Sequence, residues 1–552
     1  MRVFNLSTLM KKLTFLFILV ISFASCKQQE ADLIVTNANI YTVNSDFGKA
    51  QAFAVKDGKF LAVGTTKEIT ANYTAKEIVD AQGQTIVPGL IDAHCHFYGL
   101  GLQQQKVHLE GTKSFDEVIQ KISRFQDEKN VGYITGRGWD QNDWEVKEFP
   151  TKKKLDKLFP RTPIAIRRVD GHALLVNDAA LQYSGLSETN FPKNISGGEF
   201  ITKNGRLTGV LIDAAMKYIK IPPSTRKESI SGLLDAQRIN FSYGLTTVDD
   251  AGLSQPTIEL IDSLQNAGDL KIRIYAMVSA TQQNLDYYTQ KGIIKTDRLN
   301  VRSFKVYGDG ALGSRGAAMK KPYSDRDGHF GALIYTPERY QEIAKQIAAS
   351  EYQMNTHAIG DSANYWVLNV YKEALKNATD RRWRIEHAQI VDYNDFELFK
   401  NVIPSIQPTH ATSDMYWAGD RVGSDRIKGG YAYKKLLNTY GKVALGTDYP
   451  VEQVNPFLTF YAAVVRKDSE GYPENGYQIE NALSREETLK GMTIWAAYAN
   501  FEEHEKGSIE IGKFADFSIL SQNIMEVPDT QIPKTKATAT FVHGENVFNK
   551  ED

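Results

Sequence analysis

The feature that most constrains the fold is an alternation of short apolar segments with helical patterns through the middle of the chain. Short apolar runs bounded by Gly or Pro suit buried strands, and the longer segments between them, such as 255–267, 337–350 and 361–375, suit helices. This alternation indicates βαβ units and a parallel sheet. The candidate strands are 86–94, 244–249, 271–277, 299–307, 353–357, 384–387, 403–407 and 443–448. Because eight strands close a TIM barrel, we predict an α/β fold of the (β/α)8 type.

The strand count requires that residues 98–243 form a large insertion after the first strand. This segment has strand patterns of its own at 133–136 and 163–169 and a helical pattern at 226–242. An insertion on the C-terminal face of a barrel is a natural lid or pocket wall.

The two ends of the chain are rich in β-strand patterns separated by turns. Residues 31–64 alternate apolar and polar positions, with Asp57-Gly58 as a hairpin signal, and residues 507–547 show the same kind of pattern. The candidate domain segments are residues 31–85 and 505–552. We therefore predict a composite β-sandwich domain built from both ends around a barrel of residues 86–504.

The first 25 residues are typical of a targeting segment. Lys11 and Lys12 precede the apolar run LTFLFILVISFAS, which ends in small residues before Cys26. The run is too short for a good membrane span. It resembles a bacterial lipoprotein signal, although Phe23 stands where such signals usually carry Leu. The resemblance implies that Cys26 is lipidated and that the protein is a membrane-anchored lipoprotein of a bacterial cell envelope; a plain cleaved signal peptide is the alternative.

Composition excludes several classes of protein. The formal net charge is −1 with 24% charged residues, so no basic surplus indicates a nucleic-acid partner. The two cysteines, Cys26 and Cys95, exclude a disulfide framework. We expect a small-molecule partner, and a homodimer is left open.

Polar residues fall at the C-terminal ends of many predicted strands, the face at which barrels of this type place their active sites. His94 and His96 are two apart, so both would project to one face of a strand while Cys95 faces away. Imidazoles and carboxylates are good ligands for zinc. A lone histidine is more often a satisfied core group, but a whole set at strand ends predicts a divalent metal site. The set comprises His94, His96, Lys305, His357, His387 and Asp448. By the same alternation Glu386 would face away from His387, as a packing partner or support for a ligand rather than a base.

Sequence motifs around the candidate ligands narrow the choice of protein family. VPGLIDAHCH, RVDGHALLVN, GLTTVDDAG, FKVYGDGALGSRGAA, THAIGDSAN, RIEHAQ, GTDYPV and GSIEIGKFADFSIL occur in this order. They resemble the YtcJ-like group, or amidohydrolase family 3, of the amidohydrolase superfamily, which includes N-substituted formamide deformylases. The resemblance runs from about residue 31 to residue 547.

The resemblance implies a ligand set. His94 and His96 would bind the more buried metal with Asp448 nearby, and His357 and His387 would bind a second one. Lys305 falls where many members carry a carbamate that bridges two metals. The alternative for this lysine is a substrate contact or an ion pair, with a single metal. Zinc suits imidazole ligands best, but Mn²⁺, Fe²⁺ and Co²⁺ occupy similar sites.

The resemblance also implies a reaction. Metal-bound hydroxide would hydrolyse a non-peptide carbon–nitrogen bond of an amide, N-formyl or N-acyl compound, with Asp448 as the proton-transfer group. Cyclic amides or esters are alternative substrates. A catalytically dead, lipid-anchored binding protein is the alternative from another class.

Further residues are expected around the substrate. His172 is a candidate for binding the oxyanion, with a purely structural hydrogen bond as the alternative. Trp139 and Asp170 of the insertion are candidate pocket residues, although core packing is the alternative for Trp139. Asp309 and Arg315 follow the fourth strand and are expected in the same pocket. His410, after the seventh strand, is a weaker candidate.

Overall fold

A computed structural model describes residues 28–550 except 196, 377 and 379. The chain divides into two compact units. Of the described residues, the barrel unit comprises 28–95, Asn240–Gly252 and 272–550, and the insertion unit comprises His96–Ile239 and Leu253–Lys271.

The barrel unit contains eight strands that form a nearly closed parallel barrel, so the predicted α/β barrel is confirmed. Each of the eight candidate strands overlaps an observed one. In spatial order they are β8 (Leu90–Cys95), β15 (Leu245–Leu253), β16 (Arg273–Ser279), β18 (Leu299–Tyr307), β19 (Gln353–Ala358), β20 (Arg384–His387), β21 (Ile403–Ile406) and β22 (Ala444–Leu445). The short β17 (Ile294–Lys295) pairs antiparallel with β18.

Hydrogen bonds outside the strand-pairing pattern join the first barrel strand, β8, to the residues that follow the last one, β22. The Asp92 carboxylate accepts hydrogen bonds from the Thr447 backbone N–H (3.0 Å) and the Thr447 hydroxyl (2.7 Å). The Asp448 N–H donates to the His94 carbonyl oxygen at 2.8 Å. A Cβ at Gly446 would lie 2.5 Å from the His94 nitrogen, so only glycine permits this approach. The closure holds His94 and Asp448 side by side.

The predicted strand at 86–94 is instead two strands in two different sheets. β7 (Thr85–Pro88) pairs antiparallel with β23 (Phe517–Leu520) in the β-sandwich, whereas β8 is a barrel strand. The chain passes from one sheet to the other at Gly89, where a Cβ would lie 2.2 Å from the Thr246 hydroxyl oxygen. Because apolar residues flank Gly89 on both sides, the sequence pattern predicts one continuous strand here.

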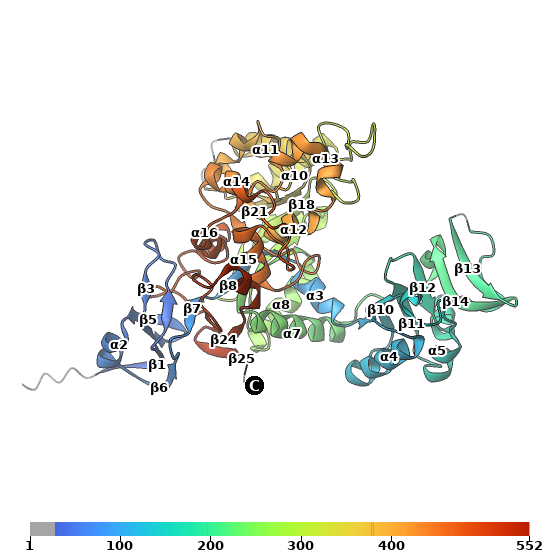
Figure 1. Cartoon of the computed structure of the whole chain (residues 1–552), viewed down its shortest axis with the longest axis horizontal. Coiled ribbons are helices and arrows are strands. Elements are labelled where there is room, and N and C mark those ends of the chain that lie inside the picture. The colour runs from blue at the N-terminus through green and yellow to red at the C-terminus, as the bar shows by residue number, and fades with distance from the viewer. Residues whose placement is uncertain (1–27, 196, 377, 379, 551–552) are drawn as a thin grey trace, which may run out of the picture. The chain divides into compact units, whose positions relative to one another are not determined.

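The β-sandwich joins both ends of the chain, and Figure 1 shows its N-terminal strands in blue and its C-terminal strands in red. Its core packs aromatic rings from both ends, for example Phe53 against Phe517 with ring centroids 4.8 Å apart. One sheet has the order β5 (Lys59–Gly64), β4 (Ala52–Lys56), β1 (Gln29–Thr36) and β6 (Tyr73–Asp80), with α2 (Thr66–Asn72) in the same region. The other has the order β25 (Glu545–Asn549), β24 (Ala537–Val542), β23, β7, β2 (Asn39–Tyr41) and β3 (Lys49–Ala50).

Helices follow most barrel strands, and three predicted helices are close to observed ones. The predictions at 255–267, 337–350 and 361–375 correspond to α8 (Gln255–Ala267), α10 (Pro337–Ala348) and α11 (Asp361–Leu375). α10 and α11 both pack on β19. Besides α2, α10 and α11, the α-helices of the barrel unit are α9 (Gln282–Lys291), α12 (Pro408–Asp414), α13 (Ala418–Arg426), α14 (Tyr433–Tyr440), α15 (Pro456–Val465), α16 (Arg485–Gly491) and α17 (Ile494–Ala499).

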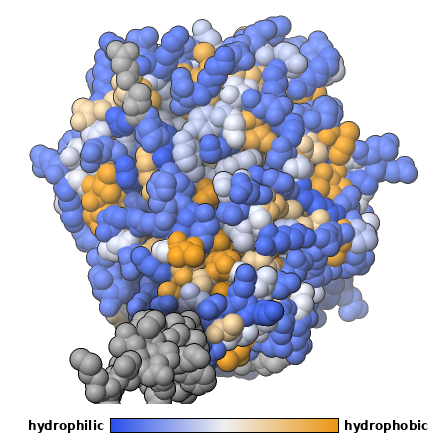
Figure 2. All heavy atoms as spheres, turned by 90° about the vertical axis from the view of Figure 1, so that its left-hand side faces the viewer, coloured by the Kyte–Doolittle hydropathy of each residue, from blue (hydrophilic) through white to orange (hydrophobic). Residues whose placement is uncertain are grey.

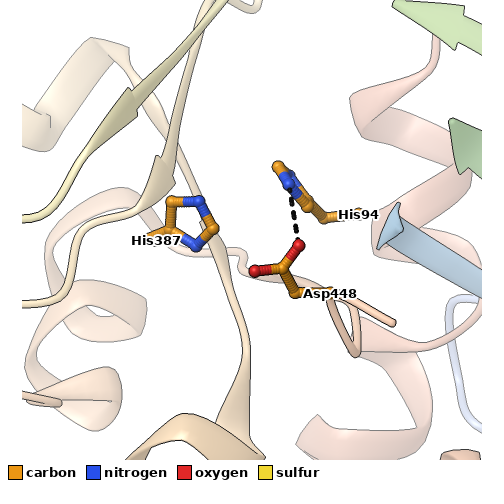
Figure 3. A group of neighbouring side chains, drawn as sticks. All are labelled: His94, His387 and Asp448. Carbon is orange, nitrogen blue, oxygen red and sulfur yellow. Dashed lines mark ion pairs between the residues drawn. The ribbon is translucent and has the colours of Figure 1, made fainter. Parts of the chain in front are cut away.

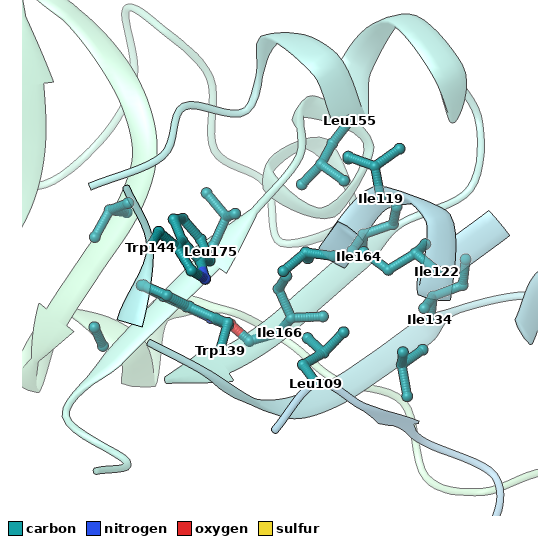
Figure 4. Packing of buried hydrophobic residues seen from close by; sticks show 14 of the residues in the cluster. Leu109, Ile119, Ile122, Ile134, Trp139, Trp144, Leu155, Ile164, Ile166 and Leu175 are labelled. Atoms are coloured by element: carbon teal, nitrogen blue, oxygen red, sulfur yellow. The ribbon is translucent and has the colours of Figure 1, made fainter. Parts of the chain in front are cut away.

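The insertion unit is built on a six-stranded sheet with its own hydrophobic core. In sheet order the strands are β13 (Gly198–Lys203), β14 (Arg206–Asp213), β12 (Ala173–Val176), β11 (Ile164–Arg168), β10 (Ile134–Trp139) and β9 (Val107–His108). The α-helices are α3 (Phe97–Gln103), α4 (Phe115–Lys129), α5 (Lys153–Leu158), α6 (Asp178–Tyr183), most of α7 (Arg226–Ser242), and α8. Figure 4 shows Ile164 and Ile166 of β11 packed with Ile119 and Ile122 of α4.

Among the described residues, none of the helices has both the length and the apolar character needed to cross a membrane. Hydrophilic residues cover most of the face shown in Figure 2, and the hydrophobic residues on it form small, separate patches.

Candidate metal centre

His94 lies at the centre of a buried polar group at the C-terminal end of β8, and its side chain is fully buried. Its Nδ1 is 2.6 Å from Glu386 Oε2. With an ionised glutamate this nitrogen carries the proton and donates, which leaves the Nε2 lone pair for another partner. That Nε2 lies 3.1 Å from Lys305 Nζ. It also lies 3.6 Å from Asp448 Oδ1, the contact that the dashed line marks in Figure 3.

His387 presents its ring to the same point from the end of β20. Its Nδ1 lies 2.7 Å from Gln407 Oε1, an acceptor, so Nδ1–H donates and Nε2 keeps its lone pair. Burial lowers the pKa of His387 well below its ordinary value, so the ring is neutral. Its backbone has φ = 76°, a value that non-glycine residues rarely adopt.

This backbone conformation overturns the expectation that Glu386 faces away from His387. Strand alternation holds only for extended backbone, and the positive φ of His387 turns the chain at this residue. Both side chains therefore reach the histidine cluster, and the Glu386 carboxylate holds the His94 ring. Burial raises the pKa of Glu386, against the influence of Arg384 and Lys305.

Asp448 follows the last barrel strand in a similar left-handed conformation, with φ = 62°. Its Oδ1 lies 3.6 Å from His94 Nε2 and its Oδ2 lies 3.6 Å from His410 Nε2. Residues held in sparsely populated backbone regions cluster at functional sites, where the surrounding structure stabilises them. His387 and Asp448 both fit that pattern.

His94, His387 and Asp448 together can hold a cation. One potential ligand atom from each lies within 4.8 Å of the others, and all three residues are buried (Figure 3). Two nitrogen donors and one carboxylate oxygen suit zinc and similar divalent metals. Carboxylate and amide acceptors on the far ring nitrogens are the supports that metal-binding histidines usually have. The residues present therefore fit a divalent ion.

Two more histidines border this group. The His357 ring centroid lies 4.6 Å from that of His387, and the His410 ring stacks on His387 at 5.8 Å. Within the described part of the chain, the buried Nε2 atoms of His357 and His410 have no hydrogen-bond partner. Burial lowers the pKa of His357 to about 3, so its nitrogen is available to a cation.

Lys305 is buried on β18, and burial lowers the pKa of its amine. Among the described residues no carboxylate lies within 4 Å of its Nζ, although Glu386 and Asp448 are near enough to act on it electrostatically. His96 lies just beyond the end of β8, as the N-cap residue of α3, so strand alternation does not extend to it.

The structure places Asp309 and Arg315 after β18 but gives both side chains partners within the protein. The Asp309 carboxylate accepts three backbone hydrogen bonds of 2.8–3.0 Å, from Ala318, Ile359 and Gly360. Asp309 therefore clamps two loops, and its Oδ1 lies 3.8 Å from His357 Nε2. Arg315 forms a bidentate ion pair with Asp325 at 2.8 and 2.9 Å.

The candidate residues of the insertion have partners within that unit. The His172 side chain is 74% exposed, and its Nδ1 lies 2.6 Å from Asp213 Oδ1. Asp170 pairs with Arg168 and accepts the His172 N–H at 3.0 Å. Trp139 is fully buried in the core shown in Figure 4 and donates to the Ile166 carbonyl oxygen at 2.9 Å. This is the position of a core residue rather than of a pocket wall. The predicted lipidation site, Cys26, lies outside the described residues.

Sequence reasoning missed Gln407. It gave Glu386 as a packing partner or a support for a ligand, but it did not identify the contact with His94. Gln407 directly follows β21 and is a polar residue after an apolar strand, the signal that identified the other site residues. The contact of Glu386 depends on a backbone turn that the sequence does not reveal.

Comparison with known proteins yields consistent matches over nearly the whole chain. A family model described as "Amidohydrolase family" matches residues 77–548. Protein LONG AFTER FAR-RED 3 of Arabidopsis thaliana is 32% identical, covering 94% of this chain and 92% of that protein. Putative amidohydrolase YtcJ of Bacillus subtilis is 30% identical, covering 93% and 98%. N-substituted formamide deformylase of Arthrobacter pascens is 24% identical, covering 94% and 98%.

Among solved structures, an uncharacterised metal-dependent hydrolase of Pyrococcus horikoshii is similar. Its TM-score is 0.74 at 28% sequence identity, and the match covers 90% of this chain and 99% of that one.

Proposed function

The chain belongs to the amidohydrolase family and is a metal-dependent hydrolase, and from this premise we propose that it cleaves a non-peptide carbon–nitrogen bond. The proposed substrates are small amides, in particular N-formyl or N-acyl amines. The similarity to a protein named N-substituted formamide deformylase supports this substrate class. The observation that carries the proposal is the convergence of His94, His387 and Asp448 on one buried point.

The metal and the residues have separate tasks in the proposed reaction. A divalent ion, for which we propose zinc, supplies a Lewis acid that activates water and polarises the carbonyl oxygen. Asp448 accepts the proton of the attacking water and delivers it to the leaving nitrogen as the carbon–nitrogen bond breaks. Glu386 and Gln407 orient the rings of His94 and His387 and keep their Nε2 atoms deprotonated.

We propose that Lys305 carries a carbamate when two metals are bound. Its neutral amine would add carbon dioxide, forming an N–C bond and releasing a proton, and would thereby offer anionic oxygens to the ions. The amine is buried 3.1 Å from His94 Nε2, and among the described residues no carboxylate lies within 4 Å of it, which supports this modification. His357 is the proposed ligand of the second ion together with His387, and His96 is a proposed ligand on the family resemblance alone.

A substrate panel tests the reaction. Zinc-loaded protein is incubated with N-(2-phenylethyl)formamide, the matching acetamide, a cyclic amide and 2-phenylethyl formate, and the products are separated by chromatography. We expect release of phenylethylamine to be fastest from the formamide or acetamide. Turnover of the ester or cyclic amide alone would replace the proposed substrate class. Absence of any turnover by metal-loaded protein would favour the binding-protein alternative. Asp448→Asn is the control for contaminating hydrolases.

We also propose export and a lipid anchor at Cys26. The positively charged start, the apolar run and the small residues before Cys26 support this proposal. Expression with radiolabelled palmitate should label the wild-type chain and leave Cys26→Ser unlabelled. Equal labelling of both would contradict the anchor.

A further inference from the structure

We propose that the insertion unit carries a binding site for a small organic carboxylate with an apolar body, separate from the metal centre. The insertion unit has a cavity of about 1090 Å³ whose lining residues all belong to that unit. This is large enough for a drug-sized ligand. Thr135 of β10 and Ala165 of β11 line the cavity, whereas their strand neighbours Ile134 and Ile164 point into the core of Figure 4. The cavity therefore lies on the sheet face opposite that core.

Basic side chains stand in register on three neighbouring strands of this face. Arg137 on β10 is paired in register with Arg167 on β11 and with His108 on β9, and all three line the cavity. Like charges directly opposite each other on neighbouring strands destabilise a sheet. An anion bound between the two arginines would offset their repulsion.

The protein does not provide that anion to the arginines. Among the described residues, neither guanidinium is within 4 Å of a carboxylate. Arg137 Nη2 donates to the Val169 carbonyl oxygen at 3.0 Å, and Arg167 Nη1 donates to the Gly171 carbonyl oxygen at 3.2 Å. Each guanidinium has five N–H donors in a planar fork that suits a carboxylate, so donors remain for a ligand.

The two acidic residues of the lining, Glu110 and Glu228, contact other lining residues rather than the arginines. The Glu228 carboxylate accepts two hydrogen bonds from Thr225, at 2.7 and 2.8 Å. The Glu110 carboxylate lies 3.9 Å from His108 Nδ1. Lys106 adds a third full positive charge to the lining, so the cavity has a surplus of cationic groups.

The rest of the cavity lining is largely apolar and therefore suits a ligand with an apolar body. Apolar lining residues include Leu102, Val107, Leu174, Ile221, Pro222 and Pro223. Tyr133 also lines the cavity, and its hydroxyl is buried without a hydrogen-bond partner among the described residues. Burial raises the pKa of Tyr133 to about 12, so its hydroxyl is neutral. A neutral hydroxyl can donate a hydrogen bond to a carboxylate oxygen. Arginine forks, a hydroxyl donor and apolar walls together fit a carboxylate on a hydrocarbon or aromatic body, rather than a bare anion.

Calorimetric titration of the full chain with 4-phenylbutyrate tests the proposal. We expect saturable binding of one ligand per chain. The uncharged 4-phenylbutanamide should bind at least about tenfold more weakly, because it removes a charge-assisted hydrogen bond. Inorganic phosphate should also bind more weakly, because it leaves the apolar walls uncovered. Equal binding of the amide would overturn the anion site, and equally tight binding of phosphate would overturn the amphipathic ligand.

Variants assign the binding to this cavity. Arg137→Gln and Arg167→Gln should each weaken 4-phenylbutyrate binding about tenfold or more. Arg124→Gln, at an exposed position on α4, is the matched control and should bind like the wild type. If Arg167→Gln unfolds, Arg137→Gln and the conservative Arg137→Lys decide the matter, since Arg137 is exposed. His387→Ala should leave binding unchanged. Binding that survives both arginine changes, or that disappears in His387→Ala, would contradict the proposal.

Discussion

His94 in the barrel and His172 in the insertion make the same local contact in opposite surroundings. Each ring places Nδ1 2.6 Å from a carboxylate oxygen, of Glu386 and Asp213 respectively. His94 is fully buried and its other nitrogen faces Lys305 and Asp448, whereas the His172 side chain is 74% exposed. A carboxylate partner alone therefore does not identify a metal-binding histidine. Burial of the ring, together with further polar side chains around its second nitrogen, is the better indication.

The largest expected effect is the loss of hydrolysis when metal is removed from the site of His94, His387 and Asp448. Removal of metal by a chelator should reduce hydrolysis of the best panel substrate to the background rate, because the Lewis acid is lost. Adding Zn²⁺ back should restore it. His172→Ala should respond to chelation and zinc as the wild type does. Full activity of verified metal-free protein would contradict a metal-dependent reaction.

The next effect concerns Asp448, the member of the cluster with a proposed proton-transfer role. Asp448→Asn should lower kcat by roughly 10²–10⁴-fold, the usual contribution of a positioned acid–base group. Its metal content should stay close to that of the wild type, since the two histidines and the amide oxygen persist. Steady-state kinetics with metal analysis of the same sample measure both quantities. Wild-type turnover in this variant would remove Asp448 from the mechanism.

A matched pair of substitutions tests whether the carboxylate next to each histidine supports metal binding: Glu386 next to His94, and Asp213 next to His172. Glu386→Gln should weaken zinc affinity by about 10–100-fold, the typical loss when the support of a metal-binding histidine is altered. Asp213→Asn makes the same kind of change next to His172 and should leave zinc affinity unchanged. Competition titration with a chromogenic zinc chelator gives both values. Similar losses in the two variants would mean that the effect is not specific to His94.

The smallest effect is the titration of His172. The Asp213 carboxylate, through its hydrogen bond and its charge, raises the pKa of His172 above its ordinary value. The pair therefore stabilises the fold below about pH 6.5, the ordinary pKa of histidine, and this contribution is lost as the pH rises through the raised pKa. Asp213→Asn should lower the pKa of His172 in NMR titrations of ¹³C-labelled histidine. An unchanged pKa would contradict the contact.

The barrel was predictable because each of its strands is an apolar run that ends near a polar residue. The strands predicted to end at or near His94, His387 and Asp448 follow this pattern. The resemblance to the amidohydrolase family, which rests on the same sequence motifs, is confirmed. Two things were not predictable from the pattern. The crossing at Gly89 separates two strands with the same apolar composition, and the turn at His387 brings Glu386 to the cluster. Both depend on contacts made by residues distant in sequence.

The insertion was less predictable than the barrel because its candidates rested on isolated residues. Trp139 and Asp170 stand at the end of strand patterns, as the barrel ligands do, but one is a core residue and the other pairs with Arg168. The register of Arg137 with Arg167 follows from strand pairing, which the sequence alone does not specify.

Metal analysis after zinc loading tests the central claim most directly. Wild type, His387→Ala and His172→Ala are loaded with Zn²⁺, freed of excess metal by gel filtration and measured by mass spectrometry of the element. The barrel cluster predicts at least about one zinc per chain in the wild type and in His172→Ala, and a large loss in His387→Ala. Full zinc content in His387→Ala, or a wild type that retains no metal, would contradict the assignment of this site.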